Sequence, residues 1–239
     1  ARKGWGIVQS GAPAGAAWPH YTGPCLLSLL EALPATPSDA HLPLTFAVQW
    51  VEKQHHSGVT EQGRRIFWGR VGTGQVRAGQ SVRLFPSGQS ARISMVLDAT
   101  RHAGAVATGA SAGIILDREV DLSRGDSVVD EGLASQGNQQ LQVTLAWMDE
   151  EPLVPGRTYW ALHGHRWVKA KVTQIVHRRN IHTLAQEPAD SLAVNEIGNI
   201  RLQLQEAVLA LPFAQSRVLG ALILVDASSH ATAGAALVQ

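Results

Sequence analysis

The chain has 239 residues with 20 basic and 19 acidic side chains, a formal net charge of +1, and a single cysteine, Cys25. One thiol excludes a fold held by internal disulfides, and no apolar run is long enough to cross a membrane. The balanced charge excludes the strong basic field of a general nucleic-acid-binding protein. These features predict a cytoplasmic protein that is large enough for one sizeable core or two ordinary ones.

The first part of the chain predicts one short helix followed by a linker. Pro24 suits the first turn of a helix, and Pro34 ends it. The residues that would share one apolar face are Leu26, Leu29, Leu30 and Leu33. Residues 34–43 have the Pro, Thr, Ser and Asp content of a linker. Because the chain opens at Ala1 without a methionine, we expect it to be trimmed there.

From residue 44 onward the sequence predicts strands. Large apolar residues alternate through residues 44–51, which is the period of a half-buried strand. The other segments with strand character are residues 65–71, 81–85, 92–97, 112–116, 141–146, 158–162, 167–175, 200–204 and 219–225. Many short strands separated by glycine-containing turns are typical of a sandwich or barrel.

A turn-rich gap at residues 131–138 divides the strands into two modules of about a hundred residues each. We therefore predict an all-β fold. The predicted boundaries are 1–41 for the helix and linker, 42–134 for the first module and 138–239 for the second.

Two motifs in the first module resemble the second domain of translation-type GTPases such as elongation factor Tu. Residues 70–82 (RVGTGQVRAGQSV) resemble its signature strand and hairpin, and residues 122–129 (LSRGDSVV) resemble its closing hairpin. Gly74 and Gly79 permit the positive φ that tight barrel turns require.

The second module is similar to the third domain of the large, GTPase subunit of sulfate adenylyltransferase. The segments that carry this resemblance are residues 147–159, 194–198, 217–226 and 231–235. Residues 18–27 resemble the last helix of that family's GTPase domain, and Ala1 matches the alanine of its guanine-contacting motif. The resemblance implies two consecutive elongation factor Tu-like β-barrels, domains two and three, behind a helical remnant of a GTPase domain. Residues 3–8 and 51–63 depart from the family pattern.

The resemblance implies that the parent is the regulatory GTPase subunit of sulfate adenylyltransferase, with GTP and Mg²⁺ as its cofactors. Its complex joins ATP and sulfate into adenylyl sulfate and pyrophosphate, and its partner is a small catalytic subunit. This chain lacks G-x-x-x-x-G-K-[ST], D-x-x-G and N-K-x-D, the motifs that hold the nucleotide. We therefore expect no catalytic residue and no cofactor in the chain, which would be inactive alone and would serve docking and coupling.

Ten histidines raise the alternative of a metal-dependent enzyme. His163 and His165 would face the same way on a strand, and His177 and His182 lie downstream. Because no cysteine or carboxylate joins them at ligand spacing, we favour histidines at a barrel's rim and expect no metal site. The adjacent His55 and His56 would point apart on a strand, which favours the same interpretation.

The other alternative is an RNA- or ribosome-facing pair of barrels from a translation factor. Its candidate contacts are Lys169, Lys171, His177, Arg178 and Arg179, but alternation at the two lysines is also typical of a strand's solvent face. The balanced charge favours the second interpretation, so we expect neither a nucleic-acid nor a membrane partner. The acidic residues 149–151 predict a solvated loop more readily than an acid–base site.

The tryptophans and the cysteine allow two interpretations each. The tryptophans of the strand region are Trp50, Trp68, Trp147, Trp160 and Trp167. They would pack in the core or between domains, or anchor a partner subunit. Cys25 has no evident activating base nearby and is expected to be structural.

Overall fold

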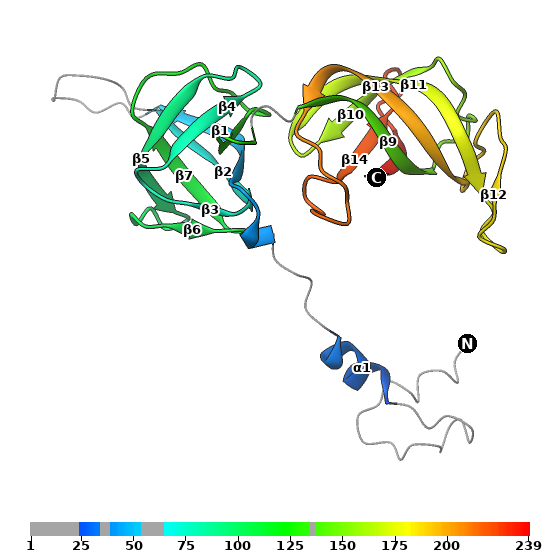
Figure 1. The fold of residues 1–239 in the computed structure, drawn as a ribbon, viewed down its shortest axis with the longest axis horizontal. Helices are drawn as coiled ribbons and strands as arrows, with labels where there is room; N and C mark the ends of the chain where they lie inside the picture. Colours follow the sequence, from blue (N-terminus) through cyan, green and yellow to red (C-terminus); the bar gives the residue numbers. More distant parts are fainter. Residues whose placement is uncertain (1–23, 34–38, 54–64, 134–136) are drawn as a thin grey trace. The chain divides into compact units, whose positions relative to one another are not determined.

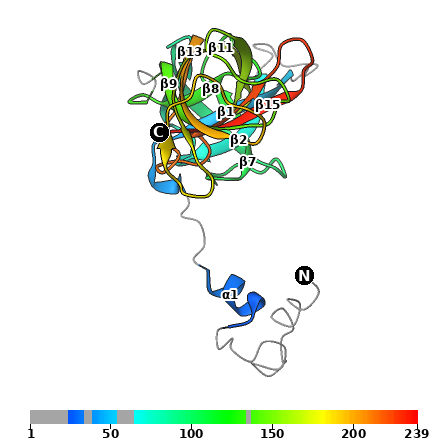
Figure 2. The same cartoon turned by 90° about the vertical axis from the view of Figure 1, so that its right-hand side faces the viewer.

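The computed structural model describes residues 24–33, 39–53, 65–133 and 137–239. The chain divides into two units, Ala1–Pro37 and Ser38–Gln239. Strands dominate the described residues, among which α1 (Leu26–Ala32) is the one α-helix and η2 (Asp39–His41) a short 3-10 helix (Figures 1 and 2). No helix among the described residues is long and apolar enough to cross a membrane.

Helix α1 lies where the sequence predicts a helix. The Cys25 side chain caps its start, accepting a hydrogen bond from the Ser28 backbone N–H at 3.4 Å. Its leucines are exposed, with Leu30 at 55% and Leu33 at 56%. The helix therefore has the apolar residues that the sequence predicts, but none of its residues is buried.

The first barrel is a closed ring of six antiparallel strands in the order β1-β2-β7-β5-β4-β8. These strands are β1 (Thr45–Lys53), β2 (Arg65–Thr73), β4 (Ser81–Phe85), β5 (Ser90–Asp98), β7 (Ser111–Leu116) and β8 (Ser127–Asp130). A small pair, β3 (Gln75–Val76) and β6 (Val106–Ala107), lies outside the ring. Inward residues such as Phe46, Ile93 and Ile114 are fully buried, because alternate positions of each strand face the core.

The second barrel is a sheet of seven strands in the order β10-β14-β15-β9-β13-β11-β12. An additional pairing of β10 with β11 closes six of these strands into a ring. The strands are β9 (Asn138–Trp147), β10 (Thr158–His163), β11 (Arg166–Arg179), β12 (Gln186–Glu187), β13 (Ile197–Val208), β14 (Ala221–Val225) and β15 (Thr232–Val238). Its core includes Leu145, Ile200 and Leu224, each with no exposed surface.

The predicted all-β fold is confirmed, and every predicted strand segment overlaps an observed strand. The pattern missed β3, β6 and β12, which have two residues each and are too short to show a period. It also missed the four-residue β8 and the seven-residue β15, whose sequence TAGAALV is rich in small residues and has no clear alternation of polar and large apolar residues. The predicted boundary between the modules falls partly on residues that the structure does not describe, so the domain limits stay a prediction.

Candidate functional site

Two side chains of the second barrel that contact the first barrel are His165, in the turn between β10 and β11, and Arg166, the first residue of β11. Gln49 of β1 donates a hydrogen bond from Nε2 to His165 Nε2 at 2.7 Å. Arg166 donates to Asp126 Oδ1, just before β8, at 3.1 Å and forms a second ion pair with Glu206 of β13. Arg166 is only 15% exposed, so its pair with Asp126 is largely shielded from solvent.

Gly125 permits the barrels to approach at this turn. Its φ is +96°, and a Cβ on it would lie 3.0 Å from the carbonyl oxygen of His165. The sequence places Gly125 in the closing hairpin of the first barrel. The structure adds that the residue must also leave room for the second barrel.

Two further contacts complete the junction. Ser216 donates from Oγ to Asp39 Oδ2 at 2.6 Å, which ties the loop before β14 to η2. An apolar cluster draws residues from both barrels, namely Phe85, Val129, Leu133 and Leu209. The junction therefore combines a buried apolar contact with directional polar contacts, as stable interfaces do.

The junction encloses a small cavity of about 60 Å³, lined by residues of both barrels that include Thr45, Phe85 and His163. A cavity of this size holds a few waters and no substrate. Among its lining residues, His163 is 8% exposed and donates from Nε2 to the Leu219 carbonyl at 2.8 Å. Burial lowers the pKa of His163, so this ring stays neutral at physiological pH.

Of the four candidate histidines, His163 and His165 both line the junction cavity, whereas His177 lies on β11 and His182 follows that strand. His163 ends β10 and faces inward, whereas His165 lies in the following turn and contacts Gln49, so the expectation that both share a strand face is wrong. Among the described residues, no group of three or more His, Cys, Asp or Glu side chains could hold a metal ion. His55 and His56 lie outside the described residues.

The acidic residues 149–151 are part of a structured loop. Asp149 accepts the Glu151 backbone N–H at 3.1 Å, and Glu151 forms an ion pair with Arg157. Arg157 also pairs with Asp226 at 3.0 Å and lies over the ring of Tyr159. These contacts give the loop a structural role.

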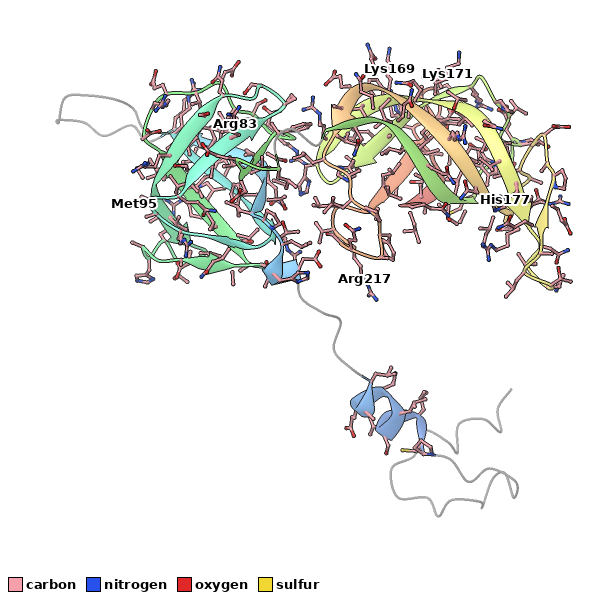
Figure 3. All side chains as sticks on the ribbon, in the orientation of Figure 1. Arg83, Met95, Lys169, Lys171, His177 and Arg217 are labelled. Carbon is pink, nitrogen blue, oxygen red and sulfur yellow. The ribbon has the colours of Figure 1, made fainter. Side chains whose placement is uncertain are left out.

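The basic residues of β11 separate into two kinds. Arg178 is neutralised by Glu187 at 2.9 Å and Glu196 at 2.7 Å. Lys169 and Lys171 point outward from the second barrel, with His177 farther along the strand (Figure 3). Lys169 lies over the ring of Trp160, 5.6 Å from its centroid.

The tryptophans have different environments. Trp147 is buried and packs edge-on against Tyr159, which confirms the core interpretation for this residue. Trp50 and Trp167 are 61% and 51% exposed. Trp68 pairs with Trp50 across β1 and β2 and donates to Glu52 Oε2 at 2.7 Å.

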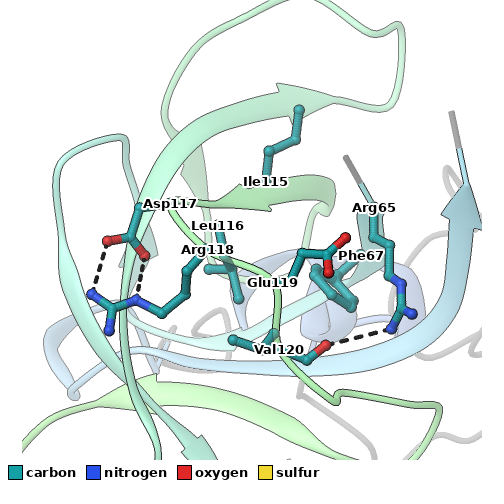
Figure 4. A pocket seen from close by; sticks show the side chains of 8 residues that line it. All are labelled: Arg65, Phe67, Ile115, Leu116, Asp117, Arg118, Glu119 and Val120. Atoms are coloured by element: carbon teal, nitrogen blue, oxygen red, sulfur yellow. Dashed lines mark hydrogen bonds and ion pairs between the residues drawn. The ribbon is translucent and has the colours of Figure 1, made fainter. Parts of the chain in front are cut away.

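A second cavity, beneath the segment that follows β7, holds about 20 Å³ (Figure 4). Asp117 and Arg118 form an ion pair at its rim, and Arg65 donates to the Val120 carbonyl at 3.4 Å. This volume suits a single water, so the cavity is no substrate site.

The described residues include one helix whose start can be compared with a phosphate-binding loop. Their one α-helix has seven residues and begins at Leu26, after a proline and a cysteine instead of a glycine-rich phosphate loop. Ala1, the predicted remnant of a guanine-contacting motif, lies outside the described residues. Hydrogen bonds from Ser28 lower the pKa of Cys25, but no base contacts this thiol within the described structure.

Comparison with known proteins identifies the fold and the relatives. Residues 140–239 match the family described as GTP-eEF1A C-terminal domain-like. A solved structure of sup35 complexed with GMPPNP superimposes with a TM-score of 0.72 at 14% identity, covering 94% of this chain and 53% of that one. At this identity the likeness concerns the fold alone, and it confirms the predicted pair of barrels.

The sequence relatives are more specific. The bifunctional enzyme CysN/CysC of Xylella fastidiosa is 36% identical over 215 residues, which is 90% of this chain. Sulfate adenylyltransferase subunit 1 of Laribacter hongkongensis is 33% identical over 225 residues, which is 92% of this chain. The chain is a homologue of sulfate adenylyltransferase subunit 1.

The homology with sulfate adenylyltransferase subunit 1 covers only part of the relatives. The chain spans 34% of the Xylella protein and 45% of the Laribacter protein. These relatives do not favour the translation-factor alternative. The predicted resemblance is confirmed.

Sequence reasoning missed the residues of the junction. Gln49, Asp126 and Arg166 have no motif that marks them as mutual partners, because their spacing along the chain is long and irregular. The signal that the sequence offers is the Arg-Gly-Asp hairpin at residues 124–126, which by itself predicts only a turn of the first barrel.

Proposed function

We propose that these barrels are the docking and coupling part of the regulatory GTPase subunit of a cytoplasmic sulfate adenylyltransferase. The parent complex would act as a nucleotidyltransferase that joins ATP and sulfate into adenylyl sulfate and pyrophosphate, driven by GTP hydrolysis. The observation that carries the proposal is the 33% identity to sulfate adenylyltransferase subunit 1 of Laribacter hongkongensis, together with the 36% identity to the bifunctional enzyme CysN/CysC, each over about nine-tenths of this chain.

In this proposal the chain has no chemical step of its own. GTP and Mg²⁺ would bind to the GTPase region of the intact parent, since the sequence of this chain lacks the motifs that hold the nucleotide. The junction at Arg166 and His165 would hold the barrels together, so that a movement of one is transmitted to the other. The partner would be the small catalytic subunit.

The proposal predicts a stable complex between this chain and the small sulfate adenylyltransferase subunit of the same source. Light scattering of the mixed proteins at micromolar concentration would measure its mass. A control with the full-length parent separates the two possible failures. Binding by the parent alone would place the interface in the GTPase region, whereas binding by neither protein would refute the proposed function.

A further inference from the structure

The outer side of the second barrel carries a polar groove of about 480 Å³ on β9, β11 and β13. Its walls include Gln140, Gln142, Thr173, Arg201 and Gln203. The adjacent inward residues of these strands, among them Leu141 and Leu202, are buried in the core. The strands that form the groove are therefore anchored by the core of the second barrel.

Strand register aligns the polar residues of the groove in two rows, one of which continues to Lys171 beside the groove. Lys171 of β11 pairs with Gln203 of β13, which pairs with Gln140 of β9. In the next row Arg201 of β13 pairs with Gln142 of β9. We use the name basic face for the following seven residues: Gln140, Gln142, Lys169, Lys171, Thr173, Arg201 and Gln203.

The basic face has cations without acidic partners. β9, β11 and β13 contain a single acidic residue, Glu206, and Arg166 engages it at the junction. Lys171 and Arg201 have no ion-pair partner among the described residues, in contrast to the neutralised Arg178. Lys169 points outward beside Lys171 (Figure 3). Cations that the fold leaves unpaired on one surface favour an anionic partner.

We propose that the basic face is the docking surface for an acidic, extended segment of the partner protein. The lysines and the arginine would pair with carboxylates, and an arginine binds a carboxylate through two parallel hydrogen bonds. The glutamine amides, which both donate and accept, would satisfy the peptide backbone between the acidic side chains. The inference rests on the proposed docking function, because it names the surface through which docking occurs.

RNA is a poorer occupant of the same surface. Phosphate groups offer acceptors only, so contacts to the RNA backbone phosphates leave the glutamine carbonyls of the basic face to the 2′-hydroxyls and base edges for donors, whereas a peptide supplies a backbone N–H at each residue other than proline. RNA affinity also depends on many cations that together release counterions. The chain as a whole is nearly neutral, with a net charge of +1.

The test compares two double charge reversals in the full chain. Lys171→Glu with Arg201→Glu reverses the basic face. Arg77→Glu with Arg83→Glu changes the net charge equally at exposed positions of the first barrel. Circular dichroism checks that both variants fold. Light scattering measures binding to the small subunit, and fluorescence polarisation measures binding to a labelled peptide of alternating glutamate and glycine.

We expect the basic-face reversal to weaken both interactions about tenfold or more, and the first-barrel reversal to leave them nearly unchanged. Equal effects of the two reversals would overturn the inference, as would tighter binding of a uridine oligonucleotide than of the peptide. If neither the unmodified chain nor the full-length parent binds the small subunit, the proposed function fails. The peptide measurement then still decides whether the basic face accepts an acidic segment.

Discussion

At the scale of single residues, Tyr159 is a buried group whose hydroxyl lacks a partner. The residue is 1% exposed, packs edge-on against Trp147, and its Oη has no hydrogen-bond partner among the described residues. Burial, opposed by Arg157, raises its pKa from 10.0 to about 12. The folded chain therefore holds this proton at a pH where the unfolded chain releases it.

Because the pKa of Tyr159 is higher in the folded chain than in the unfolded chain, the neutral tyrosine contributes fully to stability below pH 10. This contribution is lost as the pH rises from 10 toward 12. Tyr159→Phe should keep the free energy of unfolding at pH 7 or raise it by about 1 kcal/mol, since it removes an unpaired buried hydroxyl. Urea denaturation across this pH range should show a shallower decline for the variant. An identical decline in both proteins would contradict the assignment.

At the scale of elements, the turn that contains Gly125 combines two constraints. The residue has a positive φ and lies against the His165 carbonyl. Gly79 has a φ of +85°, but no atom lies within 4 Å of the position that a Cβ would occupy there. A comparison of substitutions at Gly125 and Gly79 therefore separates the energetic cost of backbone strain from that of steric contact.

Gly125→Ala should lower the free energy of unfolding by about 1–3 kcal/mol from backbone strain, with a further loss from the displaced turn. Gly79→Ala is the matched control and should show the backbone part alone. Chemical denaturation of both variants gives the comparison. Equal losses would show that the close approach of Gly125 to the second barrel has no energetic effect.

The strand β11 shows how an element distributes its charges. Its alternation predicts which residues face outward, and the structure confirms this for Lys169 and Lys171. Alternation does not tell which cations are neutralised. Arg178 meets Glu187 and Glu196 only because β12 and the turn before β13 fold against its end of the strand.

At the scale of the whole described unit, Ser38–Gln239, the ion pair of Arg166 and Asp126 joins the barrels. Arg166→Ala should lower the free energy of unfolding by about 1–3 kcal/mol, because it leaves a partly buried carboxylate without its partner. Arg118→Ala is the control, since Arg118 is 62% exposed and pairs with its neighbour Asp117. An exposed pair of this kind contributes about 0–1 kcal/mol.

A double-mutant cycle with Asp126→Ala would measure the coupling directly. If the pair joins the barrels as described, Asp126→Ala should cost less stability once Arg166 is replaced than it does in the unmodified chain. A part of the loss should remain, because Asp126 Oδ2 also accepts hydrogen bonds from the backbone N–H and the hydroxyl of Ser123. Fully additive losses in urea denaturation would show that the two side chains act independently.

The sequence by itself determined the all-β class, ten strand segments and the family resemblance. Period-two alternation, turn glycines and family motifs are local patterns that can be followed along the chain. Only the tertiary structure decided the junction, because Gln49 and His165 are 116 residues apart and Asp126 and Arg166 are 40 apart. It also decided the basic face. Whether a cation is free depends on which carboxylates folding brings to it, and no periodicity records those distant neighbours.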